Sequence, residues 1–291
     1  MQREEAAQKG FQSVRQGIFV NLFLAIVKGI VGIVGHSFAL VADAIESGAD
    51  VLSSLIVLLG LRTAAKAPDK DHPYGHGRVE AVTAIVVAGT LIIAACVIAI
   101  EAVQNIFTPH ELPKHYTLIV LVIVVIIKEI ISRRMARVAE HINSSSVKVD
   151  AWHHRADAIT ASLAAIGISI ALIGGKGYET ADDWAALCAS FIIVYNAYHI
   201  FKPALEEMMD KAPPANNIEE IRKLARQVPG VLDVEKCFMR KSGFEYFIDI
   251  HVIVDGNLNV KEGHRIGHAV KDFIMVHKPM VYDVLTHIEP N

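Results

Sequence analysis

Residues 150–157 read DAWHHRAD, and the sixteen residues that follow, from Ala158 to Ile173, carry no charge. An uncharged run of this kind predicts a membrane-spanning helix, which needs about 20 predominantly apolar residues. An ionisable side chain at bilayer depth costs at least about 2.5 to 3.5 kcal/mol, so its presence there indicates a function. The stretch therefore predicts a helical membrane protein in which His and Asp side chains at the mouth of one span have a function.

The overall composition also predicts a membrane protein. The 291 residues are 53% hydrophobic and 20% charged, whereas about a quarter of the residues in a soluble domain are charged. The net charge of -3 shows no basic excess, which argues against a nucleic-acid partner. The three cysteines are far apart and form no C-x-x-C pair, so we expect no disulfide framework.

Six apolar stretches are long enough to cross a bilayer as helices. The fourth contains Lys128, Arg133 and Arg134, so it spans only if these side chains snorkel or the helix projects beyond the membrane. We therefore predict an α-helical membrane protein with a six-transmembrane-helix bundle. The predicted spans are residues 16–35, 38–62, 79–107, 116–137, 147–175 and 181–205.

The placement of lysine and arginine predicts the orientation of the bundle. Three of the expected loops, GHS, TPHELPKHY and GGKGYET, hold two lysines between them. The basic residues that fall on the other side are Arg3, Lys9, Arg15, Arg62, Lys66, Lys70, Arg78, Arg133, Arg134, Arg137 and Lys148. Because cytoplasmic loops carry the basic excess, both termini are expected in the cytoplasm of a multi-pass inner-membrane protein. The charged N-terminal stretch lacks a small-residue cleavage site, so we interpret it as a retained arm rather than a signal peptide.

The composition becomes that of a soluble domain after a Pro- and Asn-rich break. We therefore predict a six-span transmembrane domain at 1–208 and a separate cytoplasmic domain at 209–291. In strand 244–254, alternation turns His251 away from the buried face. That face is predicted to consist of Phe244, Tyr246, Ile248, Ile250 and Val252. The expected elements, helix 218–227, strands 231–240 and 244–254, helix 260–277 and strand 281–288, form a small α+β domain, an α-β-β-α-β open-faced sandwich.

Acidic side chains form a stripe along the second predicted span. Asp43, Glu46 and Asp50 stand at i, i+3 and i+7, which places them on one helix face. In the fifth span, His153 and Asp157 are four residues apart and share a face too. At a rise of about 1.5 Å per residue, Asp50 lies about 18 Å and Asp157 about 15 Å from opposite membrane surfaces. Because the core is about 30 Å thick, these antiparallel helices bring both carboxylates to mid-membrane.

Carboxylates and an imidazole that meet at this depth predict a site for a divalent cation. Tetrahedral nitrogen and oxygen ligands favour Zn²⁺, and the carboxylate majority also admits Fe²⁺ or Mn²⁺. The alternative is a set of interhelical hydrogen bonds or ion pairs that only hold the bundle together. Asp43 is either a third carboxylate of the site or a helix-packing residue.

Three segments together carry a resemblance to a known family. The acidic span, the loop DKDHPYGHGRVEA at 69–81 and WHHRADAITAS at 152–162 resemble the cation diffusion facilitator family of metal/proton antiporters, over nearly the whole chain. The resemblance implies a homodimer in the lipid bilayer and an exchange of metal ions for protons. It implies that 1–208 is the transport domain and that 209–291 is a metal-binding and dimerisation domain. It also implies that Glu46, Asp50, His153 and Asp157 form the transport site. Glu46 departs from the His or Asp that the family often has there.

Further candidate ligands lie outside the spans. Asp69, His72 and His76 combine a His-x-x-x-His spacing with an acid, which is typical of a metal chelate, and the alternative is a solvated polar loop. The closing THIE resembles the family's His-x-acid ligand pair. For a regulatory metal site at a domain dimer interface, we predict His251, His287 and Glu289 as ligands, with His264 and His268 as further candidates. Arg78 and Asp210 match an ion pair between subunits in the family, or form a plain surface salt bridge.

We predict a secondary transporter that exports a divalent cation in exchange for protons, because the chain has no P-loop and no other nucleotide-hydrolysis motif. No catalytic cofactor is expected, since the metal is the cargo and a regulatory ligand. A membrane-bound metal sensor is the alternative. An intramembrane metalloenzyme would need a motif such as H-E-x-x-H, which the sequence lacks.

Overall fold

A computed structural model describes residues 18–19, 21–64, 66–108, 112–142, 145–175, 177–243 and 245–291, with side chains left out at 61, 131–132, 134–142 and 145–156. The chain divides into two compact units. The helical unit contains the residues up to Leu58 together with Val86–Phe201, and the sheet unit contains Leu59–Ile85 and Lys202–Asn291. Three long helices therefore begin or end in the sheet unit.

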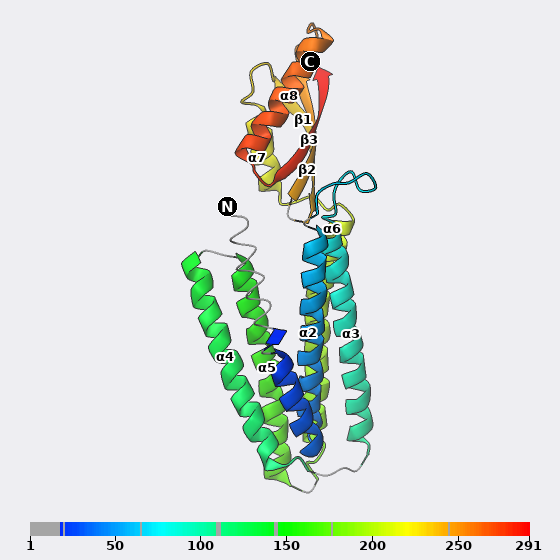
Figure 1. The fold of residues 1–291 in the computed structure, drawn as a ribbon, viewed down its shortest axis with the longest axis vertical. Helices are drawn as coiled ribbons and strands as arrows, with labels where there is room; N and C mark the ends of the chain where they lie inside the picture. Colours follow the sequence, from blue (N-terminus) through cyan, green and yellow to red (C-terminus); the bar gives the residue numbers. More distant parts are fainter. Residues whose placement is uncertain are drawn as a thin grey trace. The chain divides into compact units, whose positions relative to one another are not determined.

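Apolar runs form the helices that Figure 1 shows. Four helical segments are long and apolar enough to span a membrane among the residues described, and helix Asn21–Val34 is apolar but shorter. The charged second half of α4 lowers its hydropathy. The prediction of six spans is therefore not confirmed, although the part of the chain described is a helical, membrane-type bundle. The long helices are α2 (Phe38–Ala64), α3 (Val79–Ile106), α4 (His115–Ile142), α5 (Ser145–Gly174) and α6 (Ala181–Met208).

Small side chains let the helices of this unit approach one another closely. A Cβ atom on Gly167 of α5 would lie 2.4 Å from the Cβ of Ala185 on α6, so only glycine fits there. Asp182, at the start of α6, accepts hydrogen bonds from Ser37 Oγ and from the backbone N–H of Ala39, each at 3.2 Å. This carboxylate caps the N-terminus of α2 and thereby fixes the position of α2 along α6.

The C-terminal part of the sheet unit has the predicted α-β-β-α-β order. Its sheet has the strand order β1-β2-β3, in which β1 and β2 are antiparallel and β2 and β3 are parallel. Parallel pairing needs a crossover, which α8 supplies. The elements are α7 (Ala215–Ala225), β1 (Asp233–Ser242), β2 (Glu245–Val254), α8 (Val260–His277) and β3 (Val281–Pro290).

One face of this sheet packs against both helices. Ile248, Ile250 and Val252 of β2 are fully buried with Val270 of α8 and Ile221 of α7. The predicted buried face is therefore confirmed at these three positions of β2 and at the half-buried Tyr246, while Phe244 lies outside the described residues. His251 lies on the opposite, open face of the sheet, which leaves its imidazole available as a ligand.

Candidate metal-transport and metal-binding sites

Four buried carboxyl groups form what we call the acidic cluster: Asp43, Glu46 and Asp50 on α2 and Asp157 on α5. Each is at most 7% exposed. Glu46 lies close enough to the other three to interact with them electrostatically. The helical period places the three α2 side chains on one stripe, and helix packing brings Asp157 to that stripe.

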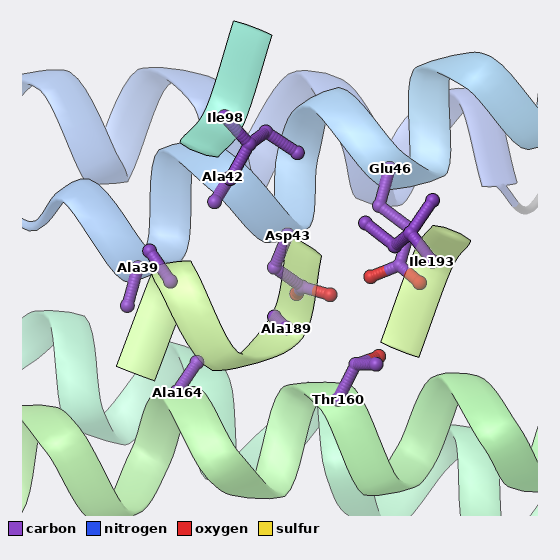
Figure 2. A pocket seen from close by; sticks show the side chains of 10 residues that line it. Ala39, Ala42, Asp43, Glu46, Ile98, Thr160, Ala164, Ala189 and Ile193 are labelled. Atoms are coloured by element: carbon purple, nitrogen blue, oxygen red, sulfur yellow. The ribbon is translucent and has the colours of Figure 1, made fainter. Parts of the chain in front are cut away.

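A small cavity adjoins this cluster. Figure 2 shows the carboxyl groups of Asp43 and Glu46 directed from α2 into it, with Thr160 of α5 and Ala189 of α6 among the opposite lining residues. The cavity holds about 10 Å³, which is about the space that a single water molecule needs. Oxygen donors around a space of this size suit one small cation rather than a larger solute.

Two lysines reach the acidic cluster from neighbouring helices. Lys28, fully buried in Asn21–Val34, has its Nζ 2.8 Å from Asp43 Oδ2, 2.9 Å from the Asp43 carbonyl oxygen and 2.5 Å from Ser47 Oγ. Lys128 of α4 is 2% exposed, and its Nζ lies 3.4 Å from Asp157 Oδ2. Both ammonium groups therefore offset part of the cluster's negative charge.

The burial of Lys128 corrects one prediction. We expected either that its side chain snorkels to the membrane interface or that the helix projects beyond the membrane, and instead the side chain is buried beside the carboxylate of Asp157. Arg133 pairs with Glu129 on its own helix at 2.6 Å, and the side chain of Arg134 lies outside the described residues. Sequence reasoning missed Lys28, although a lone lysine in the apolar run FVNLFLAIVKGIVGIVG at 19–35 signals a buried partner.

The predicted nitrogen ligand of the transport site is His153. Its backbone belongs to α5, but its side chain, like that of His154, lies outside the described residues. Among the described residues, two groups of three have ligand atoms that all lie within 4.8 Å of one another, and both are in the sheet unit. The carboxylates of the acidic cluster are thus close neighbours without such convergence.

The first group is the loop triad, Asp69, His72 and His76. His72 Nδ1 lies 3.1 Å from Asp69 Oδ1, and His76 Nε2 lies 3.4 Å from Asp69 Oδ2. The backbone N–H groups of His72 and Asp71 donate to Asp69 Oδ1. The hydrogen bond from the His72 backbone is the main cause that lowers the pKa of the Asp69 carboxyl group, which therefore stays ionised as a metal ligand must.

The second group is the sheet triad, His251, His287 and Glu289, on the open face. The parallel register sets His251 of β2 beside His287 of β3, and their ring centroids are 4.9 Å apart. Glu289 Oε1 lies 2.5 Å from His251 Nδ1 and 3.7 Å from His287 Nε2. A hydrogen bond with the Glu235 side chain and one with His251 lower the pKa of Glu289, so this carboxylate is also ionised.

Two of the further histidine candidates do not join the sheet triad. His264 and His268 lie on α8, which packs against the other face of the sheet. Their Nε2 atoms are 3.1 Å apart, so they form a separate pair. Their i, i+4 spacing places both side chains on one face of α8, and α8 lies on the side of the sheet opposite the sheet triad.

Arg78 and Asp210 form their ion pair within one chain. Arg78 Nη2 donates to Asp210 Oδ1 at 2.5 Å, and both side chains are about half exposed. Asp210 stands just after α6 with φ at +55°, a backbone conformation that a short polar residue tolerates. The pair therefore needs no second subunit to form, and its predicted role between subunits stays a prediction.

A bundle with buried carboxylates, joined to a small α/β domain with metal-ligand triads, defines a class of membrane-integral metal-ion transporters. The chain belongs to the cation diffusion facilitator family: residues 14–209 match the cation efflux transmembrane domain, and residues 213–291 match the cytoplasmic domain of cation efflux proteins. Membership shows that the protein is a transporter of metal ions and not an enzyme.

Three curated relatives illustrate this membership. The manganese efflux system protein MneP of Bacillus subtilis is 30% identical over 94% of this chain and 93% of its own length. Metal tolerance protein C1 of Arabidopsis thaliana is 28% identical over 99% of this chain and 64% of its own length. The magnetosome protein MamB of Magnetospirillum gryphiswaldense is 27% identical over 93% and 90%.

Proposed function

We propose that this protein exports a divalent cation from the cytoplasm in exchange for protons, through a site formed by Glu46, Asp50, His153 and Asp157. The observation that carries the proposal is the acidic cluster, because four carboxyl groups buried in a membrane-type bundle need a compensating cation. The carboxylate of Asp43 is held by Lys28. We therefore assign Asp43 to helix packing rather than to the ligand set.

The ligand chemistry supports Mn²⁺, Fe²⁺ and Zn²⁺ as cargo. Three carboxylates with one imidazole form a harder ligand set than a site rich in nitrogen, and harder sites accept Mn²⁺ and Fe²⁺. The similarity to MneP, whose name describes manganese efflux, favours Mn²⁺. We propose that the protein transports Mn²⁺ measurably beside Zn²⁺.

Proton exchange follows from the chemistry of the ligands. Carboxylate and imidazole groups must lose their protons to bind a metal, so protons and metal compete for the same site. His153 is the member whose side-chain type titrates near physiological pH. An opposing proton gradient would therefore drive release of the metal on the outer side of the membrane.

We further propose an inner-membrane protein with both termini in the cytoplasm, a transport domain at 1–208 and a regulatory domain at 209–291 that forms a homodimer. On the open face of the sheet, the apolar side chains of Phe238 and Leu285 are 61% and 67% exposed. They flank Asp249 in the strand register. Exposed apolar side chains beside the sheet triad support pairing of two such faces, and metal at the triad would stabilise that pair.

Metal uptake by sealed proteoliposomes tests the transport proposal. With a proton gradient imposed, we expect Mn²⁺ and Zn²⁺ uptake accompanied by proton movement in the opposite direction. Asp50→Asn should abolish uptake, whereas Glu101→Gln, a matched change of an exposed acid on α3, should not. Uptake that is independent of the proton gradient would refute the exchange, and no uptake by the unmodified protein would refute transport of these ions.

A further inference from the structure

We propose that Lys128 is a tethered cation that competes with the transported metal for the Asp157 carboxylate, and that it thereby keeps metal binding weak enough for release. This inference rests on the proposed transport site. It concerns a buried ammonium group that plays no part in the exchange described above.

The position of Lys128 shows that its charge acts on the whole acidic cluster. Its Nζ lies 3.4 Å from Asp157 Oδ2 and also interacts electrostatically with Asp43, Glu46 and Asp50. The side chain is almost fully buried, in a helix of the membrane-type bundle. A charge at that depth is costly without strong electrostatic compensation, so the cluster and Lys128 depend on each other.

The two buried lysines differ in how firmly they are held. Lys28 Nζ donates hydrogen bonds to the Asp43 carbonyl oxygen and to Ser47 Oγ, and it also forms an ion pair with Asp43 Oδ2 at 2.8 Å. Lys128 Nζ has no hydrogen-bond acceptor among the residues described, and its distance to Asp157 exceeds the 2.7–2.9 Å or so of a charge-assisted hydrogen bond. Lys28 is therefore locked in place, whereas Lys128 can withdraw without breaking such a bond.

The charges of the cluster balance one divalent ion. Metal binding requires deprotonated ligands, and with all four carboxyl groups deprotonated the described carboxylates (-4) and the ammonium groups of Lys28 and Lys128 (+2) sum to a charge of -2. One divalent cation neutralises this charge, whereas a monovalent ion or a second divalent ion would not. The positive charges of Lys28 and Lys128 thus favour one divalent ion in the cluster over a monovalent ion or a second divalent ion.

Lys128 also limits the affinity of the site. A divalent ion bound by Asp157 lies close to the Lys128 ammonium group, and two cations in a medium of low dielectric constant repel each other strongly. Metal binding must therefore push Lys128 away from Asp157, and the return of Lys128 assists release. Transport requires a site that binds strongly enough to load and weakly enough to unload.

A purely structural role makes a different prediction. If Lys128 only holds α4 against α5, its removal should loosen the site and weaken metal binding. If it competes with the metal, Lys128→Gln should bind the metal more tightly and release it more slowly. Lys128→Arg keeps the charge and should resemble the unmodified protein in either case, which makes it the matched control.

Equilibrium Zn²⁺ binding by the full-length purified protein separates the two roles. Binding at the transport site is taken as the difference between each protein and its Asp157→Asn counterpart, which removes the contribution of the triads. We expect Lys128→Gln to bind about tenfold tighter, as the loss of one nearby like charge predicts, and to show a lower maximal transport rate in proteoliposomes. Equal or weaker binding by a folded Lys128→Gln protein would overturn the proposal.

A second pair of variants tests the charge balance itself. Asp43→Asn leaves the cluster at -1 and should bind Zn²⁺ more weakly, and the double variant Asp43→Asn/Lys128→Gln restores -2 and should recover the affinity. Asp43→Asn tests the charge balance even if Lys128→Gln alone does not fold, since an unchanged Zn²⁺ affinity in Asp43→Asn would contradict the proposed charge of -2.

If the unmodified protein moves no metal, the proposed function fails. If it does and Lys128→Gln binds no tighter, only this inference fails.

Discussion

The acidic cluster and the two triads differ in how they accommodate charge. The cluster is buried and includes two lysines in its electrostatic environment, whereas the triads are partly exposed and their carboxylates are flanked by imidazoles. The triads already hold three ligand atoms within 4.8 Å, and the cluster does not. A site that must release its ion benefits from a competing cation, while a site that senses metal benefits from ligands held ready to bind.

Among the predictions that separate the acidic cluster from the triads, Asp157→Ala is expected to have the largest effect. We expect loss of transport for every metal, because the variant removes the carboxylate that links α5 to the stripe on α2 and leaves Lys128 buried without its nearest partner. Metal binding at the triads should persist. Uptake in inside-out vesicles, together with equilibrium binding on the purified protein, checks both statements.

The matched control for that variant is Glu101→Ala, which removes an exposed carboxyl group from another long helix. Normal uptake by Asp157→Ala would contradict the intramembrane site. Loss of folded protein in Asp157→Ala alone would instead favour the alternative of structural bonding within the bundle.

The sheet triad can be tested apart from the membrane, because residues 211–291 contain their own hydrophobic core. We expect this fragment to be soluble and to dimerise. The double variant His251→Ala/His287→Ala should bind Zn²⁺ more weakly by a factor of roughly 10 to 100 or more, since two of three ligands are lost. Calorimetry on the fragment measures the difference, and His277→Ala is the control for a histidine outside the triad.

Identical affinities of the fragment and the double variant would remove both histidines from the ligand set. If His264→Ala/His268→Ala instead weakened Zn²⁺ binding by a similar factor, the pair on α8, and not the open face, would hold the metal.

The choice of metal should depend on Glu46. In the proposed transport site, Glu46 would supply a hard oxygen where an imidazole would favour zinc, so Glu46→His should lower the rate for Mn²⁺ relative to Zn²⁺ by several-fold, roughly the effect of one ligand change. Competition assays in proteoliposomes with each metal in turn measure this ratio. An unchanged ratio would show that helix packing, rather than this ligand, controls selectivity.

The smallest expected effect concerns Glu289 and pH. Its pKa is lowered in the folded protein, by Glu235 and then by His251, so its ionised form contributes stability that is complete above the ordinary glutamate pKa of about 4.3. The contribution is lost as the pH falls through the lower pKa of the folded state. We expect Glu289→Gln to reduce the Tm of fragment 211–291 slightly at pH 7, with no difference at the acid end of a pH series.

Periodicity within single elements carried most of the sequence-based predictions. The stripe of Asp43, Glu46 and Asp50 follows from 3.6 residues per turn, and the α-β-β-α-β order follows from the change between helical and alternating patterns. The family also followed from the order of its motifs. The helix 260–277 was predicted with the bounds that the structure gives it.

Contacts between elements could not be predicted in this way. Lys28 and Asp43 are separated by fifteen residues, and Lys128 and Asp157 belong to different helices, so their partners depend on how the helices rotate and pack. The register of β2 and β3 likewise decided that His251 meets His287, while α8 kept His264 apart.

The sequence by itself determined that this is a membrane protein with a stripe of acids in one helix, because hydropathy and helical period are local properties of a chain. Only the tertiary structure decided which carboxylate is held by Lys28, which one faces Lys128, and where three ligands converge. The physical reason is that electrostatic interactions act through space and depend on distance and burial, and neither quantity can be read from residue spacing once the two groups lie on different elements.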